Sequence, residues 1–240
     1  MLENIRLDRI VFLDIETVSN YKTYQKLPKK WKKLWDKKAS FLINNDESPE
    51  DIYTKAAIYA EFGKVICISV GLYREINGKR QFRVKSFYGD NEKELLSQFG
   101  EMLTKYFESP NYLLCAHNGK EFDFPYLARR ILVNQLPLPY LLDIAGRKPW
   151  EVQHLDTLQL WKFGDYKHYT SLDLLTALFG IESPKTDMDG SDVGRVYWEE
   201  GNLEKIVQYC EDDVIAIAQL LLAYKGVEGI KKSEIYRSKD

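Results

Sequence analysis

Apolar and polar positions predict several strands in the first half of the chain. Residues 9–15 (RIVFLDI) and 64–73 (KVICISVGLY) are apolar, β-branched runs bounded by polar residues, which is typical of buried strands. Residues 81–88 (QFRVKSFY) alternate apolar and polar side chains, as a half-buried strand does. Asn77 and Gly78 lie between the last two segments. Because both residues tolerate a positive φ, they predict a tight two-residue hairpin turn.

Helical spacing predominates later in the chain. Apolar side chains recur at intervals of three and four within residues 91–107, and similar spacing predicts helices over residues 124–133, 171–179, 191–199 and 203–224. A short buried strand is predicted at residues 111–116. This order predicts an α/β fold, a mixed β-sheet flanked by α-helices. We expect a single domain over residues 1–240, with an insertion at about residues 19–63 that does not follow the pattern.

Composition excludes several classes of protein. Cys67, Cys115 and Cys210 are flanked by apolar residues and form no CxxC pair, so we expect reduced thiols in a cytoplasmic protein and no zinc site. We expect no signal peptide and no membrane span, because no apolar run approaches the roughly 20 residues that cross a bilayer. The net charge is −2 and the pI is about 6.0. Nucleic-acid-binding domains are usually basic, so the average charge argues against such a partner.

Two carboxylates lie at the C-terminal end of the first predicted strand. Asp14 and Glu16 are two residues apart, so they lie on one face of the strand. Ionised carboxylates that point inward from an apolar run are costly unless a positive charge compensates them. Mg²⁺ or Mn²⁺ would do so, because both prefer hard oxygen ligands. The alternative is a strand that emerges into solvent, where Asp and Glu are common.

Two further polar groups lie at element ends. Asp123 follows the strand at residues 111–116 and either belongs to a functional site or caps the next helix. Tyr209 and Asp213 are four apart on the last helix and share one face, beside its buried stripe. Alone, such a pair is more often solvated. We expect Glu211 and Asp212 to face water.

Together, these motifs resemble those of the DEDD superfamily of 3′–5′ exonucleases. The order is Asp-x-Glu on the first strand, Asn-x3-Phe-Asp after a later strand, and Tyr-x3-Asp on the last helix, which is the pattern of the tyrosine subgroup. The stretches LDIET, EFGKVICIS, HNGKEFDFPYLARR and YCEDDV are similar to the proofreading exonuclease domain of family B DNA polymerases and to stand-alone predicted exonucleases related to it. The resemblance covers nearly the whole chain except about residues 19–55.

The resemblance implies a ribonuclease H-like fold, two divalent metal ions and hydrolytic removal of nucleotides from a 3′ end. Two ions about 3.5–4 Å apart can stabilise both the attacking and the leaving oxygen. The implied catalytic residues are Asp14, Glu16, Asp123, Tyr209 and Asp213, and the four carboxylates among them are the implied metal ligands for Mg²⁺ or Mn²⁺. The implied substrate contacts are Thr17, Asn118 and Phe122.

Each catalytic residue has an expected role under this hypothesis. Asp14 would bridge both ions, and Asp213 would hold the ion on the nucleophile side. Glu16 would contact that ion or the attacking water, while Asp123 would support the leaving-group side through waters. Tyr209 would orient the attacking water, because a phenol with an ordinary pKa near 10 is a poor base at neutral pH.

A lysine-rich segment lies inside the insertion. Eight lysines occur within residues 22–38, and Asp36 is the only acidic residue among them. Trp31 and Trp35 are four apart in the same segment and share a helix face. Lysines can follow a phosphate backbone while aromatics stack on bases. The equally supported alternative is a surface helix docked by its tryptophans, with solvated lysines.

Other polar residues give weaker signals. His117, His154 and His168 lack the spacing of metal ligands, and we expect His117 to be a core or turn residue. Asp156 is expected to be structural or to support the site indirectly. Lys185 is a candidate phosphate contact from its loop position alone.

The predicted function is a metal-dependent 3′–5′ exonuclease that acts on single-stranded DNA or on frayed 3′ ends. An RNA exonuclease and a non-catalytic nucleic-acid-binding module are the alternatives. The five intact motif residues argue against the binding module. A polymerase or repair protein could use the enzyme in trans, but the sequence shows no docking surface for one and does not determine the oligomeric state.

Overall fold

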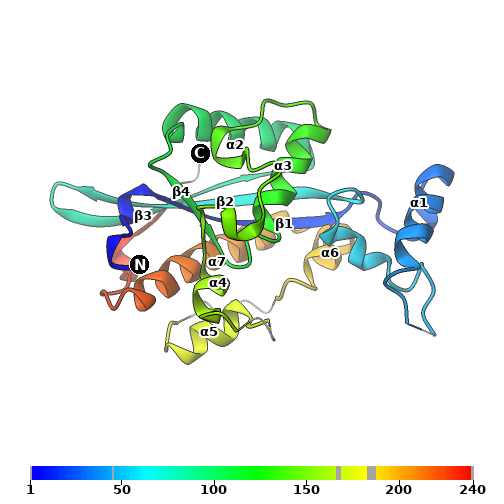
Figure 1. Cartoon of the computed structure of the whole chain (residues 1–240). Coiled ribbons are helices and arrows are strands. Elements are labelled where there is room, and N and C mark those ends of the chain that lie inside the picture. Colours follow the sequence, from blue (N-terminus) through cyan, green and yellow to red (C-terminus); the bar gives the residue numbers. More distant parts are fainter. Residues whose placement is uncertain (1, 45, 166–168, 183–187, 239–240) are drawn as a thin grey trace.

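The central element is a mixed β-sheet (Figure 1). The structure, a computed structural model, describes residues 2–44, 46–165, 169–182 and 188–238. Within these residues the sheet has the strand order β5-β4-β1-β2-β3-β6. The strands are β1 (Ile10–Ser19), β2 (Gly63–Ile76), β3 (Lys79–Tyr88), β4 (Leu113–Ala116), β5 (Leu155–Asp156) and β6 (Ile235–Arg237). β2 is antiparallel to β1 and β3, while β4 is parallel to both β1 and β5.

Helices cover both faces of the sheet. They are α1 (Lys29–Ala39), α2 (Glu92–Phe107), α3 (Asp123–Val133), α4 (Thr157–Lys162), α5 (Leu172–Leu178), α6 (Val193–Arg195) and α7 (Leu203–Tyr224). A π-helical turn at Val196–Glu200 follows α6. α2 and α3 lie on one face and α7 on the other (Figure 1). The predicted α/β class, a mixed sheet flanked by helices, is therefore confirmed. Among the described helices, none combines the length and apolar character needed to cross a bilayer.

The central strand β1 is buried on both faces. Its odd-numbered apolar residues pack beneath α2 and α3, whereas Ile10 and Phe12 pack against α7. Since side chains alternate across a strand, Asp14 and Glu16 face the α7 side. β1 continues to Ser19, beyond the predicted end at residue 15, and a bulge interrupts its pairing with β2 just after Glu16. The alternative of a strand that emerges into solvent at Asp14 is therefore wrong.

The hairpin and helix predictions are largely confirmed. Asn77 and Gly78 have φ values of 53° and 72°, as a two-residue turn with two left-handed positions requires. Asn91 caps α2 by accepting a hydrogen bond from the backbone N–H of Glu94, and Ser171 caps α5 in the same way at Leu174. These caps explain why both helices begin where they do.

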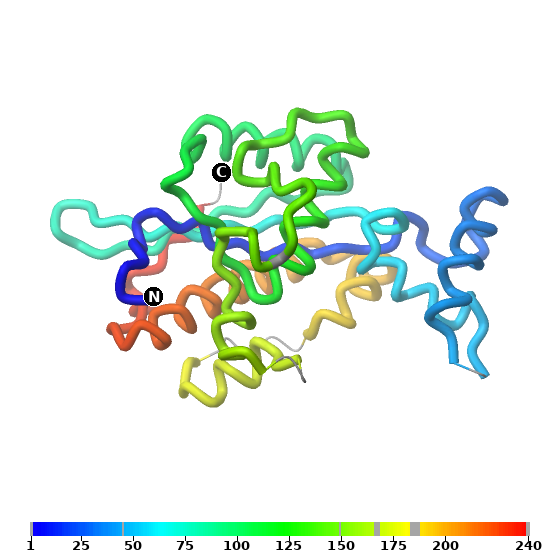
Figure 2. The backbone as a smooth tube through the Cα atoms, in the orientation of Figure 1, coloured from blue at the N-terminus to red at the C-terminus, as the bar shows by residue number. Residues whose placement is uncertain are grey.

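The insertion between β1 and β2 has a small core of its own. Trp35 is fully buried there, and its indole N–H donates to the carbonyl of Pro49 at 2.7 Å. Trp31 remains 38% exposed and contacts the ring of Phe62 edge-on. Figure 2 shows this segment beyond the end of β1, beside the main body. The interpretation of a helix docked by its tryptophans is thus confirmed for Trp35.

A buried ion pair joins α2, α3 and the end of the insertion. Arg130 Nη2 lies 2.5 Å from Glu92 Oε2, and both side chains are less than a tenth exposed. Arg130 also donates to the carbonyl of Ala60, and Glu92 accepts from the backbone N–H of Val65. Because every charge in this group has a partner, the pair can remain ionised in the interior.

Removing Arg130 should therefore be costly. We expect Arg130→Met to lower the free energy of unfolding by about 3–5 kcal/mol, because Glu92 is left as an uncompensated buried charge. The double variant Arg130→Met with Glu92→Gln should recover part of the loss, since glutamine still accepts from Val65 without a charge. Urea unfolding of both variants would measure this, and an additive double variant would contradict the assignment.

Candidate active site

One cavity collects the motif residues of three separate elements. It has a volume of about 340 Å³ and opens beside the carboxyl-terminal half of β1. Its lining includes Asp14 and Glu16 from β1, Asp123 from the first turn of α3, and Tyr209 and Asp213 from α7. Residues that lie almost 200 positions apart in the chain thus share one site.

The packing of α7 aims its two polar residues at the cavity. Cys210 and Val214 are fully buried and hold the helix against the sheet. Tyr209 and Asp213 lie one turn apart beside that buried stripe. The Tyr209 hydroxyl and the Asp213 carboxylate both line the cavity and influence each other's pKa. Burial, followed by the neighbouring carboxylates, raises the Tyr209 pKa well above its usual range, so this phenol keeps its proton at neutral pH.

The loop before α3 is held by a carboxylate from β5. Asp156 accepts hydrogen bonds from the backbone N–H of Asn118 at 3.0 Å and of Lys120 at 3.1 Å. It also caps α4 through the N–H groups of Leu158 and Gln159. Asn118 itself has a φ of 63°, a left-handed position that asparagine tolerates. Asp156 therefore shapes the turn that leads to Asp123, as the sequence predicts.

Asp123 does not cap its helix. Phe122 occupies the N-cap position of α3 without a side-chain hydrogen bond, and Asp123 is the first helical residue. Its side chain is 3% exposed, and backbone N–H groups of Asp123 and Ile15 favour its charged form. The capping interpretation of Asp123 is wrong because this carboxylate is turned toward β1.

The cavity concentrates negative charge. Burial, and then Glu16, Asp213 and Asp123, raise the pKa of Asp14 well above its usual range. Burial, and then Asp213, do the same to Glu16. Burial raises the pKa of Asp123 to about 8 and that of Asp213 to about 7. Among the described residues, no lysine or arginine lines the cavity.

The donor set fits a divalent cation. Asp14 Oδ2 is buried and has no hydrogen-bond partner among the described residues. One ligand atom each from Asp14, Glu16 and Cys210 lie within 4.8 Å of one another. The Cys210 thiol donates to the backbone carbonyl of Asp14 at 3.4 Å, and burial raises its pKa. The carboxylate oxygens are therefore the available ligands, and they are the type that Mg²⁺ and Mn²⁺ prefer.

The three predicted substrate contacts separate into two groups. Asn118 and Phe122 line the cavity. Thr17 is buried, is not part of the lining, and donates its hydroxyl to the carbonyl of Ala57 at 2.9 Å. Because β1 bulges after Glu16, the side chain of Thr17 serves the contact with the insertion.

Three further residues line the cavity that the sequence did not single out. Tyr169 is 65% exposed, and its ring contacts that of His117 edge-on. Asp173 and Asp189 are exposed carboxylates of the same lining. Tyr169 and Asp189 lie in loops, where helical or strand periodicity gives no signal. Asp173 lies in the first turn of α5, where the spacing of apolar residues predicts the helix but not which polar side chain reaches the cavity.

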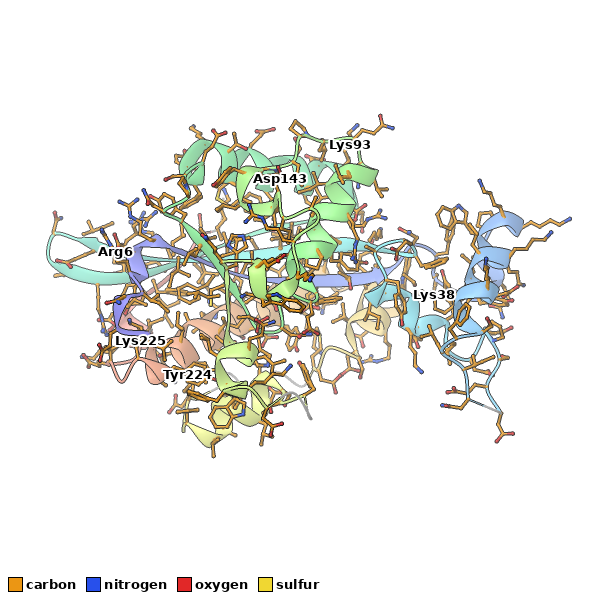
Figure 3. All side chains as sticks on the ribbon, viewed as in Figure 1. Arg6, Lys38, Lys93, Asp143, Tyr224 and Lys225 are labelled. Carbon is orange, nitrogen blue, oxygen red and sulfur yellow. The ribbon has the colours of Figure 1, made fainter. Side chains whose placement is uncertain are left out.

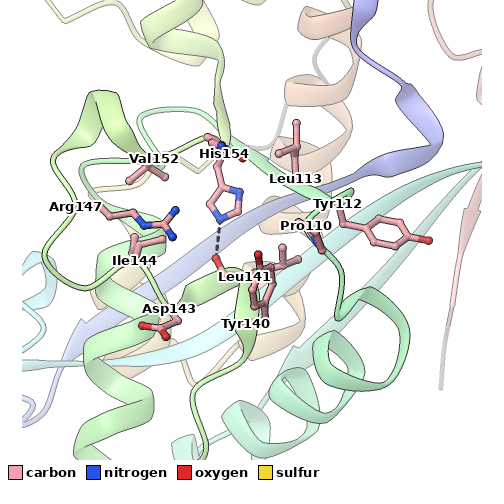
Figure 4. A pocket seen from close by; sticks show the side chains of 11 residues that line it. Pro110, Tyr112, Leu113, Tyr140, Leu141, Asp143, Ile144, Arg147, Val152 and His154 are labelled. Atoms are coloured by element: carbon pink, nitrogen blue, oxygen red, sulfur yellow. Dashed lines mark hydrogen bonds between the residues drawn. The ribbon is translucent and has the colours of Figure 1, made fainter.

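The histidines are structural where they are described. His117 uses one ring nitrogen toward Thr157 Oγ1 and the other toward the carbonyl of Thr170, both at 2.9 Å. His154 accepts from the N–H of Leu114 and donates to the carbonyl of Leu141, beside a separate cavity of about 120 Å³ (Figure 4). Burial lowers the His154 pKa to about 4, so it stays neutral. His168 and Lys185 lie outside the described residues.

The prediction that Glu211 and Asp212 face water is wrong. They are only 7% and 4% exposed. Arg237 on β6 donates to both, at 2.8 Å and 2.5 Å, and Ser86 on β3 donates to Glu211. This clamp joins the C-terminal strand to α7 at the two positions that immediately precede Asp213.

A mixed α/β sheet that brings four carboxylates and a tyrosine into one cavity is typical of enzymes that cleave phosphodiesters with divalent cations. Residues 58–239 match a family described as predicted 3′–5′ exonuclease related to the exonuclease domain of PolB. The chain belongs to this family, and the prediction of a 3′–5′ exonuclease is confirmed at that level. The matched region contains Asp123, Tyr209 and Asp213, whereas Asp14 and Glu16 precede it.

Among solved structures, the chain is similar to E. coli exonuclease I in complex with a dT13 oligonucleotide. The TM-score is 0.40 and the sequence identity 12%, over 89% of this chain and 45% of that chain. The chain thus spans less than half the length of that protein.

Divalent cations should stabilise the protein more at about pH 8 than at about pH 5. A carboxyl group with a raised pKa stabilises the fold below its unfolded pKa of about 4, and this contribution is lost as the pH rises through the folded value, which is about 7 for Asp213 and about 8 for Asp123. A cation at 100 times its Kd adds about 2.7 kcal/mol, or roughly 5–10 °C in Tm. Thermal unfolding with Mg²⁺, with Mn²⁺ and with chelator would measure the difference.

The comparison with and without cation is needed because His117 and His154 titrate in the opposite sense. Burial lowers their pKa values, so they favour the fold as the pH rises. The variant Asp14→Asn with Asp213→Asn is the control and should lose the cation-dependent shift. A shift of the same size in this control would place the cation elsewhere.

Proposed function

We propose that the protein is a divalent-cation-dependent exonuclease that removes nucleotides from the 3′ end of single-stranded or frayed DNA. The observation that carries the proposal is the convergence of Asp14, Glu16, Asp123, Asp213 and Tyr209 on one cavity, whose described lining contains no lysine or arginine. Family membership supports the direction of cleavage, and the relation of that family to PolB supports DNA as the substrate.

The four carboxylates would hold two Mg²⁺ or Mn²⁺ ions, with Asp14 shared between them. When bound, such ions stabilise negative charge on the reacting phosphate and lower the pKa of water. The unpartnered Asp14 Oδ2 is the group that gains most from a cation, since a buried carboxylate oxygen without a partner is costly.

Tyr209 would position the attacking water. Its raised pKa keeps the phenol protonated, so it acts as a hydrogen-bond donor and orienting group and not as a base. Its side chain lines the same cavity as the expected ligands, one helical turn from Asp213. Orienting a nucleophile in this way lowers the entropic part of the barrier.

Aromatic side chains would hold the terminal nucleotide. Phe122 and the exposed Tyr169 both line the cavity. Stacking of a base on an aromatic ring is tolerant of sequence, as a general exonuclease requires. Asn118 would add a polar contact from the turn that Asp156 fixes.

The proposal extends to the domain organisation and to the cellular compartment of the protein. We propose that residues 1–240 act as one exonuclease domain, in which residues 20–62 form the insertion between β1 and β2. Cys67, Cys115 and Cys210 are free and buried, which fits a reducing compartment such as the cytoplasm.

Asp14→Asn and Asp213→Asn should each abolish nuclease activity while leaving the fold intact. Either change removes a ligand charge from the site and relieves repulsion, so the variants should unfold at the same or a higher temperature than the wild type. The assay is laddering of 5′-labelled single-stranded DNA, single-stranded RNA and a mismatched primer-template with Mg²⁺ or Mn²⁺. Wild-type rates in the variants would contradict the assignment of these carboxylates.

The order in which the enzyme prefers these substrates distinguishes a DNA exonuclease from an RNA exonuclease. Preference for the DNA strands supports the proposal, whereas faster cleavage of RNA would favour the alternative of an RNA exonuclease. Cleavage that persists in chelator would rule out a cation-dependent mechanism.

Tyr209→Phe should lower kcat by roughly 100-fold with little change in KM. The phenyl ring keeps the packing of residue 209 against the core cluster that includes Val18 and Ile66, while the hydroxyl that orients the water is lost. Single-turnover cleavage would measure the rate, and Tyr24→Phe, which removes a phenol in the insertion, is the matched control. An equal loss in both variants would indicate a general effect of removing a tyrosine hydroxyl.

A further inference from the structure

The outer face of α1 carries a straight row of lysines. Lys29, Lys33 and Lys37 are spaced four residues apart, and all three are exposed. We name these three residues the lysine ridge. With a rise of 1.5 Å per residue the ridge spans about 12 Å. In Figure 3, side chains with blue nitrogen atoms at their tips extend into solvent from the outer side of α1.

The opposite face of α1 fixes the helix in place. Trp35 and Ala39 are completely buried in the core of the insertion. Lys32 lies over the ring of Tyr24 and Lys38 over that of Tyr59, each 4.2 Å from the ring centroid. Two lysines thus serve the internal packing, while the ridge takes no part in it.

Nearby acidic groups do not neutralise the ridge. Asp36 accepts a hydrogen bond from the Tyr24 hydroxyl at 2.6 Å on the docked side. Glu47 and Asp51 accept from neighbours within their own loop. Among the described residues, no ion pair involves Lys29, Lys33 or Lys37.

The ridge is unfavourable for the helix that carries it. Like charges at a spacing of four cost about 0.2–0.5 kcal/mol per pair. Lysine in the first turn also opposes the helix dipole, and that turn has neither an acidic residue nor a capping side chain. Local features that oppose the fold are expected at functional surfaces, and a polyanion is the ligand that three exposed lysines would attract.

We propose that the lysine ridge binds the phosphates of a nucleic-acid strand outside the catalytic cavity, and so holds the substrate while its 3′ end is processed. This inference rests on the proposed function. The insertion begins just after Ser19. Ser19 lies three residues beyond Glu16 on β1, which corresponds to about 10 Å along the strand. The ridge lies outside the family match at residues 58–239, so it is a feature of this chain beyond the matched region.

A membrane surface is the less suitable partner. A helix that lies on a bilayer needs an apolar face to insert between the headgroups. In α1 the centre of that face is buried in the core of the insertion through Trp35 and Ala39, which leaves Trp31 and Leu34 as the large apolar side chains of the helix that are exposed. Three phosphates of a flexible strand, in contrast, need only exposed cations at regular spacing.

The test compares two sets of three substitutions. The ridge variant carries Lys29→Gln, Lys33→Gln and Lys37→Gln, because glutamine has a helix propensity similar to that of lysine. The control variant carries Lys79→Gln, Lys93→Gln and Lys105→Gln, which remove three exposed lysines from other surfaces. Both are made in the full chain on the Asp14→Asn background, and binding of a long fluorescent single-stranded DNA is measured by anisotropy at several salt concentrations.

The ridge variant should bind the long strand at least 10-fold more weakly than the control. The slope of log K against log salt should fall by about 2, since each phosphate contact to a single strand contributes about 0.7. With Asp14 intact, both variants should cleave a tetranucleotide at the wild-type rate, because so short a strand does not extend far from the cavity. Replacing the three ridge lysines by arginine should restore binding.

Each contrary outcome has a distinct meaning. Equal binding by ridge and control variants would overturn the ridge proposal while leaving the proposed function intact. Slower cleavage of the tetranucleotide by the ridge variant would show that the ridge acts on the cavity and not as a separate surface. If the ridge variant lost binding to anionic lipid vesicles but bound DNA as tightly as the control variant, the proposal would be overturned in favour of a membrane surface. If the wild type bound DNA normally but showed no nuclease activity, the proposed function would be refuted while the ridge proposal would stand.

Discussion

The repulsion among four carboxylates in one cavity is the constraint on which the rest of the structure depends. Asp14, Glu16, Asp123 and Asp213 each destabilise the charged form of a neighbour, and burial adds to the effect. Such a cluster persists only where rigid elements prevent it from opening. β1 supplies that rigidity, because it is hydrogen-bonded to β2 on one side and to β4 on the other and is covered by helices on both faces.

The supports of the cavity are themselves ionic or strongly hydrogen-bonded. Asp156 fixes the turn before Asp123 through two backbone N–H groups, and Arg237 fixes α7 through Glu211 and Asp212. Neither Asp156 nor Arg237 is part of the described cavity lining, so neither side chain adds a charge to it. That lining contains no lysine or arginine among the described residues, and this leaves its negative charge available for external cations.

Local patterns placed the motif residues on the faces that meet at the cavity, but they did not predict the Arg237 contacts that support α7. Strand alternation placed Asp14 and Glu16 on one side, and helical spacing placed Tyr209 beside Asp213. The burial of Glu211 and Asp212 depends on Arg237, whose short strand pairs with β3 far away in sequence. No local pattern indicates such a pairing. Tyr169 was missed for the same reason, because a loop residue reaches the cavity only through the tertiary structure.

The near-neutral total charge conceals a separation of opposite charges. The cavity contains six acidic side chains when Asp173 and Asp189 are included, whereas the basic residues of α1 lie in the insertion beyond the end of β1. At an ionic strength near 0.15 M, screening acts over about 8 Å, so each region presents its own sign to a ligand. A polyanion is therefore repelled at the cavity and attracted at α1 until cations occupy the carboxylates. Net charge is thus a poor guide to the partner of this chain, and the positions of the charges along β1, α7 and α1 are the informative quantity.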